Sequence, residues 1–169
     1  MTRPLPSSLR QERRAIRTLT LPGLIRLVTE IDDNGPISHR RGSLQGAFGD
    51  LTRAQLRRAI DTARDLGLVH ADQEAPDRYR LTAAGEDLAE VYDTAARWAR
   101  SHQFPSPSSD FVTRVQHTFQ LQSSEPTSAR TAQSAPLKAL SEWLTAHPRV
   151  LHQAGDCSSG AAQESGLAA

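Results

Sequence analysis

The fold is decided by one stretch, Asp50 to Val69, which reads D-L-T-R-A-Q-L-R-R-A-I-D-T-A-R-D-L-G-L-V. Thr52 is placed to be the N-cap of a helix, and Gln55, three residues later, completes a capping box that satisfies two backbone donors. Gly67 stands where the helix must end, because glycine adopts a positive φ at no steric cost. The stretch therefore predicts one bounded helix that leads into a strand.

This predicted helix is amphipathic. Its apolar positions recur at helical spacing and its polar positions fall largely opposite, with Leu56, Ala59, Ile60 and Ala63 on one side and Arg57, Arg58, Asp61, Thr62 and Asp65 on the other. Arginines in the N-terminal half suit contacts to guanine in a DNA groove, whereas the alternative is a charged face that is simply solvated. The two aspartates confine any DNA contact to the first two turns, Thr52 to Arg58.

Two segments precede this helix. Residues 21–34 predict a core helix with Pro22 in its first turn, which ends at Asn34-Gly35-Pro36. For residues 37–49 we expect a short helix that packs on the next one, although each of its internal glycines weakens it by about 1 kcal/mol. Helix, short helix, turn and long helix follow in the order of a helix-turn-helix.

The entry of the short helix carries His39, Arg40 and Arg41, which we expect to meet a DNA backbone. A metal site at His39 is not expected, because no second ligand stands at a suitable spacing.

Two alternating runs after Gly67, L-V-H-A-D and R-Y-R-L-T, predict a hairpin around the turn formed by residues 73–77. We expect Val69, Ala71, Tyr79 and Leu81 to point inward and His70, Asp72, Arg78 and Arg80 to point outward. A hairpin directly after the second helix of a helix-turn-helix is a wing, and Arg78 and Arg80 are its candidate phosphate or minor-groove contacts. The acidic residues of the turn argue against a wing tip deep in the minor groove.

Thr82 is predicted to cap a further helix that carries a broad apolar stripe, namely Leu88, Val91, Tyr92, Ala95 and Trp98. The stripe offers more surface than a small domain needs to cover internally, so we assign it to a homodimer interface. The alternative is that these residues complete the core of the monomer or line a small-molecule pocket.

The outer parts of the chain divide by composition. Residues 1–20 predict an arginine-rich helix or arm with Arg10, Arg13, Arg14 and Arg17 on one face, which either contacts an anionic partner or is a solvated leader. Residues 103–122 predict an accessory helix, 123–135 a flexible linker, 136–148 a short helix whose Trp143 docks on another surface, and 149–169 a disordered tail.

Whole-chain composition limits the remaining classes of function. The formal net charge is +1, and the arginine excess lies in residues 1–41, with 8 basic against 4 acidic side chains. The single cysteine, Cys157, allows no internal disulfide and no cysteine-based metal site, and we expect no cofactor. Neither a signal peptide nor a membrane span is expected, which predicts a cytoplasmic protein without a membrane partner. The six histidines are scattered and no catalytic motif is present, so an enzyme is not expected.

Two sequence signatures carry a resemblance: Gly67-Leu68-Val69 after the predicted recognition helix, and L-T-A-A-G-E-D-L (81–88) after the wing. With Gly35-Pro36 and the run V-Y-D-T-A-A-R-W-A-R-S-H, they resemble winged-helix transcriptional regulators of the HxlR type, with MarR-like regulators as near relatives. The resemblance covers residues 22–102. It implies a mainly α fold with a small β-hairpin wing, here extended by extra C-terminal helices, and a homodimer on a roughly palindromic site.

The resemblance also implies which residues contact DNA: Thr52, Arg53, Ala54, Arg57 and Arg58 in the major groove, and Arg78 and Arg80 in the wing. Three departures separate this chain from the family pattern. The cysteine that many HxlR-type proteins carry before the first helix is absent, the segment between Gly35-Pro36 and Thr52 is longer, and residues 103–169 have no counterpart.

The sequence therefore predicts a homodimeric regulator of transcription that binds double-stranded DNA, with a small-molecule effector left open. The alternative is a winged helix that serves as a protein-interaction module and does not recognise DNA.

Overall fold

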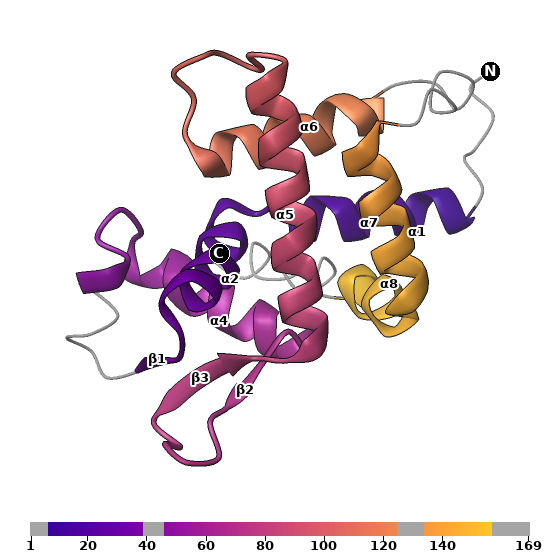
Figure 1. Cartoon of the computed structure of the whole chain (residues 1–169). Coiled ribbons are helices and arrows are strands. Elements are labelled where there is room, and N and C mark those ends of the chain that lie inside the picture. The colour runs from indigo at the N-terminus through magenta and orange to yellow at the C-terminus, as the bar shows by residue number, and fades with distance from the viewer. Residues whose placement is uncertain (1–6, 39–45, 125–133, 157–169) are drawn as a thin grey trace, which may run out of the picture.

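The computed structural model describes residues 7–38, 46–124 and 134–156. Within these ranges the chain is mainly helical with a small antiparallel sheet (Figure 1). Its elements are α1 (Ser7–Leu19), α2 (Pro22–Asn34), β1 (Ile37–Ser38), α4 (Arg53–Asp65), β2 (Val69–Ala71), β3 (Arg78–Leu81), α5 (Ala83–Ser101), α6 (Phe111–Ser124), α7 (Ala135–Ala146) and α8 (Pro148–Asp156).

The sheet has three strands in the order β1-β3-β2, so the expected hairpin of β2 and β3 is confirmed and a third strand joins it. β1 occupies the first two residues of the segment expected to be a short helix, and that part of the expectation was wrong. Ile37 is buried and lies opposite Tyr79 of β3. A two-residue strand has no periodicity of its own, because only its pairing partner specifies it.

The rest of the expected short helix lies largely outside the described residues, as do His39, Arg40 and Arg41. Gly46 and Ala47 are helical, and a turn then leads to α4.

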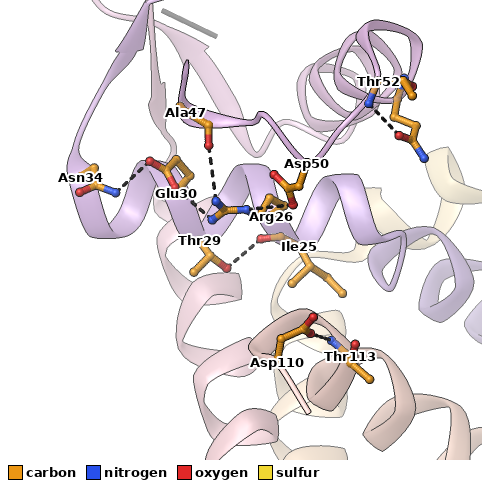
Figure 2. Close-up of polar contacts among 11 residues, drawn as sticks. Ile25, Arg26, Thr29, Glu30, Asn34, Ala47, Asp50, Thr52, Asp110 and Thr113 are labelled. Atoms are coloured by element: carbon orange, nitrogen blue, oxygen red, sulfur yellow. Dashed lines mark hydrogen bonds and ion pairs between the residues drawn. The ribbon is translucent and has the colours of Figure 1, made fainter. Parts of the chain in front are cut away.

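α5 is the central helix, and α6 and α7 pack against it (Figure 1). The accessory helix expected over residues 103–122 is found as α6, but it begins at Phe111, after Asp110 accepts a hydrogen bond of 2.7 Å from the Thr113 amide (Figure 2). Trp143 of α7 is buried, and its indole N–H donates to the Ala84 carbonyl of α5 at 3.1 Å. The docking predicted for Trp143 is therefore found on its own domain.

The N-terminal segment is not a free arm. Ala15, Ile16 and Leu19 of α1 are buried in the common core, and the helix packs against α8 and α6. The arginines predicted to share one face do lie away from this core, with Arg10, Arg14 and Arg17 exposed and Arg13 half-buried.

The C-terminal boundaries also differ from expectation. The tail was expected to be disordered from residue 149, but α8 runs to Asp156 and buries Val150. Residues 123–124 belong to α6 and Ala135 begins α7, while residues 125–133 of the expected linker lie outside the described part of the chain. A nine-residue helix is too short to be stable in isolation, and α8 is stabilised by packing on α1, which the local sequence does not reveal.

Candidate nucleic-acid interface

The predicted limits of α4 are confirmed. Gln55 donates its amide to the Thr52 hydroxyl at 3.2 Å, and the Thr52 amide donates to the Gln55 side chain at 2.9 Å (Figure 2), which completes the capping box. At the other end Gly67 has φ 69° and donates its amide to the Arg64 carbonyl at 3.0 Å. Both ends are specified by neighbouring residues, so the sequence alone sufficed to place them.

The two faces of α4 separate as expected, with one exception. Leu56, Ala59, Ile60 and Ala63 are buried, but Thr62, expected on the polar side, is buried as well. The exposed side is lined by Arg53, Ala54, Arg57, Arg58, Asp61 and Asp65, which border an open depression of about 600 Å³.

Charge is graded along this exposed side. Neither Arg57 nor Arg58 forms an ion pair with any residue in the described ranges, so both guanidinium groups remain available to an anion. Asp61 and Asp65 follow them towards the C-terminus of the helix, with the exposed Arg64 between them in the sequence, so two acidic side chains there face one basic side chain. The helix dipole adds partial positive charge at the N-terminal end, where the arginines stand. The arrangement can therefore hold an anionic group along the first two turns and repels one further on.

Arg26 of α2 fastens the turn that precedes α4 (Figure 2). Its guanidinium lies 3.1 Å from Glu30 and 3.6 Å from Asp50, and it donates to the Ala47 carbonyl at 3.4 Å. The same group lies over the ring of buried Phe48, 5.9 Å from its centroid. The sequence predicts only that this residue belongs to a core helix. Of its partners, only Glu30 lies at a helical spacing of four residues; the others cannot be inferred from the sequence.

A close approach between α2 and α4 sets the position of the exposed face of α4. A Cβ atom added to Gly23 would lie 3.3 Å from the Cβ of Ala59 and 3.5 Å from the Gln55 carbonyl oxygen. The two helices thus meet through their smallest side chains, and the buried side of α4 is held against the core while its arginines face outward.

The two sequence signatures that flank the hairpin meet in space. The Thr82 amide donates to the Leu68 carbonyl at 2.9 Å, and its hydroxyl donates to the Gly67 carbonyl at 2.6 Å. A Cβ added to Gly85 would lie only 2.2 Å from the Leu68 oxygen, so a side chain has no room there. The first turn of α5 is therefore seated directly on the exit of α4, and this contact fixes the hairpin between them.

The hairpin differs from a simple alternating wing at its tip. Val69 is buried as expected, but Ala71 is exposed and Asp72 is buried, so the expected facing of these two residues was wrong. Asp72 accepts a hydrogen bond from the Glu74 amide at 3.2 Å and pairs with Arg80 at 3.3 Å. These two partners turn the Asp72 side chain inward.

The same contacts make the two arginines of the hairpin, Arg78 and Arg80, differ in their surroundings. The Glu74 amide, and secondarily Arg80, hold the pKa of Asp72 below its ordinary value despite the desolvation of the carboxylate. The charge of Arg80 is thereby largely balanced. Arg78 is exposed and has no ion pair within the described ranges, so of the two hairpin arginines it is the one whose charge is not balanced there.

The α5 stripe, which the sequence assigned to a homodimer interface, is largely covered within the single chain. Leu88, Val91, Tyr92 and Ala95 are buried within the single chain, and Trp98 is half-buried and stacks on His102, with 4.2 Å between ring centroids. The helices that cover the stripe lie beyond the region of the family resemblance, so the pattern on α5 alone could not reveal them. The alternative expectation, that these residues complete the monomer core, is the one the structure supports.

The described residues contain neither a metal-binding cluster nor a membrane-spanning helix. No group of three or more histidine, cysteine, aspartate or glutamate side chains is arranged there to hold a metal ion. None of the helices in that part of the chain combines the length and apolarity required to cross a membrane. Comparison with family models, with curated proteins and with solved structures finds no match to this chain.

Proposed function

We propose that this protein is a winged helix-turn-helix regulator that binds double-stranded DNA through the N-terminal half of α4. The observation that carries the proposal is that α4 buries one face and presents two arginines on the opposite, concave side, Arg57 and Arg58, which form no ion pair with the residues that the structure describes. α2, the turn before α4, α4 itself and the three-stranded sheet then form the winged-helix unit, with Arg78 in its wing.

The dimensions suit this role. The segment Thr52–Arg58 rises about 10 Å along the helix axis, and the major groove of B-DNA is about 12 Å wide. An arginine in the groove donates two hydrogen bonds to the O6 and N7 atoms of guanine, and each such pair contributes about 1–3 kcal/mol of discrimination. Arg53 and Arg78, at the edges of the contact, are suited to phosphates.

The test begins with selection of bound duplexes from a random library, followed by binding isotherms on the enriched sequence. The double variant Arg57→Ala/Arg58→Ala should lose most of its preference for that sequence, by a factor of roughly 10 to 100 for each guanine contact removed. The matched control is Arg10→Ala/Arg14→Ala, which removes the same charge from exposed positions on α1. If both double variants bind the selected duplex equally well, the assignment of α4 is refuted.

A second candidate function is a winged helix that binds a protein. It is favoured by the mixed charge of the α4 depression, where Asp61 and Asp65 face the same side as the arginines, and by the Asp72–Arg80 pair, which balances one of the two arginines of the wing. The salt dependence distinguishes the two. A DNA-binding protein that contacts several phosphates loses affinity steeply with salt, whereas an interaction module shows no selected duplex at any salt concentration.

A further inference from the structure

Other helices of the same chain cover the apolar face of α5, apart from the half-buried Trp98. From α6, Val115 and Phe119 are buried against it, and from α7 come Leu140, Trp143 and Leu144. Polar contacts hold α7 and α1 on α5: the Trp143 indole donates to the Ala84 carbonyl, and the Tyr92 hydroxyl donates to the Leu19 carbonyl of α1. A second copy could reach this face only by displacing α6 and α7.

The surface of the described residues has little exposed apolar area for another dimer interface. Leu121, with 41% of its surface exposed, is the only large hydrophobic side chain classed as exposed in the described ranges. A stable dimer interface buries about 800 Å² on each partner and has an apolar centre. One leucine at the end of α6 is far smaller than such a centre.

We propose that a single copy of this chain recognises one short, non-palindromic duplex element, with α6 and α7 occupying in cis the face of α5 that a second subunit would otherwise cover. The proposal rests on the DNA binding proposed above and specifies its target. It replaces the homodimer on a palindromic site that the sequence resemblance implies.

The size of the target follows from the geometry of α4. Arg53, Arg57 and Arg58 lie within Thr52–Arg58, about 10 Å of helix, which corresponds to about three base pairs at 3.4 Å each, while the fourth exposed arginine, Arg64, lies in the last turn between Asp61 and Asp65 in the sequence. Arg78 of the wing adds a backbone contact beside this element. Because one copy contributes one α4, the selected sequence contains one such element, and two elements on one duplex are filled independently.

The first measurement is the mass of the free full-length protein by sedimentation equilibrium, from micromolar to high-micromolar concentration. We expect the chain mass of 18.5 kDa throughout. A single-chain mass also establishes that α7 covers α5 of its own chain rather than that of a second copy. A mass of twice 18.5 kDa overturns the inference even if DNA binding is found.

The second measurement uses the duplex enriched by selection. We expect one non-palindromic element and a complex of one chain with one duplex. An enriched inverted repeat that two copies fill cooperatively overturns the inference and leaves the proposed DNA binding intact. If no duplex is enriched while the free mass is that of one chain, the proposed function fails instead, and the duplex target fails with it.

A surface variant completes the test. Leu121→Asp places a charge on the exposed leucine and leaves the α5 face covered, so we expect neither the mass nor the duplex stoichiometry to change. If a dimer is observed and this substitution dissociates it, copies associate through α6, and the inference is overturned.

Discussion

Replacing Gly85 by alanine should destabilise the protein, although alanine is the better helix former. The added methyl group would lie 2.2 Å from the Leu68 carbonyl oxygen and 3.1 Å from Cδ2 of Leu81. Ordinary carbon–oxygen contact requires a separation larger by roughly 1 Å, so the first turn of α5 must move away from the exit of α4. The atom it meets belongs to the backbone and cannot rotate aside.

The magnitude follows from three contributions. Overpacking of this kind costs about 1–3 kcal/mol, and loosening the Thr82 amide to Leu68 hydrogen bond of 2.9 Å costs about 1 kcal/mol more. The higher helix propensity of alanine offsets up to about 1 kcal/mol. We therefore expect the free energy of unfolding to fall by about 1–3 kcal/mol.

The assay is urea denaturation followed by far-ultraviolet circular dichroism, with the midpoint and the slope both fitted. Gly46→Ala is the matched control, because Gly46 is helical and a Cβ there meets nothing within 4 Å. This control should leave stability unchanged or raise it by up to about 1 kcal/mol. Equal stability of the two variants would refute the direct seating of α5 on Leu68.

Three further outcomes are expected. Arg26→Ala should lower the free energy of unfolding by about 1 kcal/mol, because the turn before α4 loses its ion pair and hydrogen bond; an unchanged urea midpoint would contradict this. Tyr92→Phe leaves the Leu19 carbonyl unpaired in the core and should cost about 1–3 kcal/mol in the same assay, without altering the sedimentation mass. The Glu74 amide holds the pKa of Asp72 below its ordinary value, so this carboxylate stabilises the hairpin above the unfolded-state pKa, and the stabilisation is lost as the pH falls below about 4. The amide resonance of Glu74 should therefore titrate below the ordinary carboxyl range, and Asp72→Asn should abolish the titration; a midpoint near 4 would count against the contact.

Elements with local signals were predicted well. The capping box at Thr52, the stop at Gly67 and the hairpin of residues 69–81 each depend on residues a few positions apart, and each is found. The wing tip was less predictable. Strict alternation of the strand predicts an exposed Asp72 side chain. Its carboxylate is instead buried in the turn, because it accepts a hydrogen bond from the Glu74 amide and pairs with Arg80.

The candidate site divides in the same way. The exposed arginines of α4 could be found from helical periodicity, since their exposure depends only on which face is apolar. The contacts of Arg26 with Ala47 and Asp50 could not be predicted, because these two residues lie more than twenty positions further along the chain. Nor could the balance of charge between Asp72 and Arg80 be inferred, because it depends on how the hairpin turns.

By itself the sequence determined the ends and faces of α4, the hairpin and the order of most helices, because capping, glycine torsion and amphipathic spacing act over one or two turns of chain. Only the tertiary structure decided that β1 joins the sheet, that α1 and α8 belong to the domain, and that α6 and α7 cover α5. An apolar stripe states that a face must be buried, but not which segment buries it. On α5 the covering helices come from the same chain, and the surface that suggested a second subunit is its core.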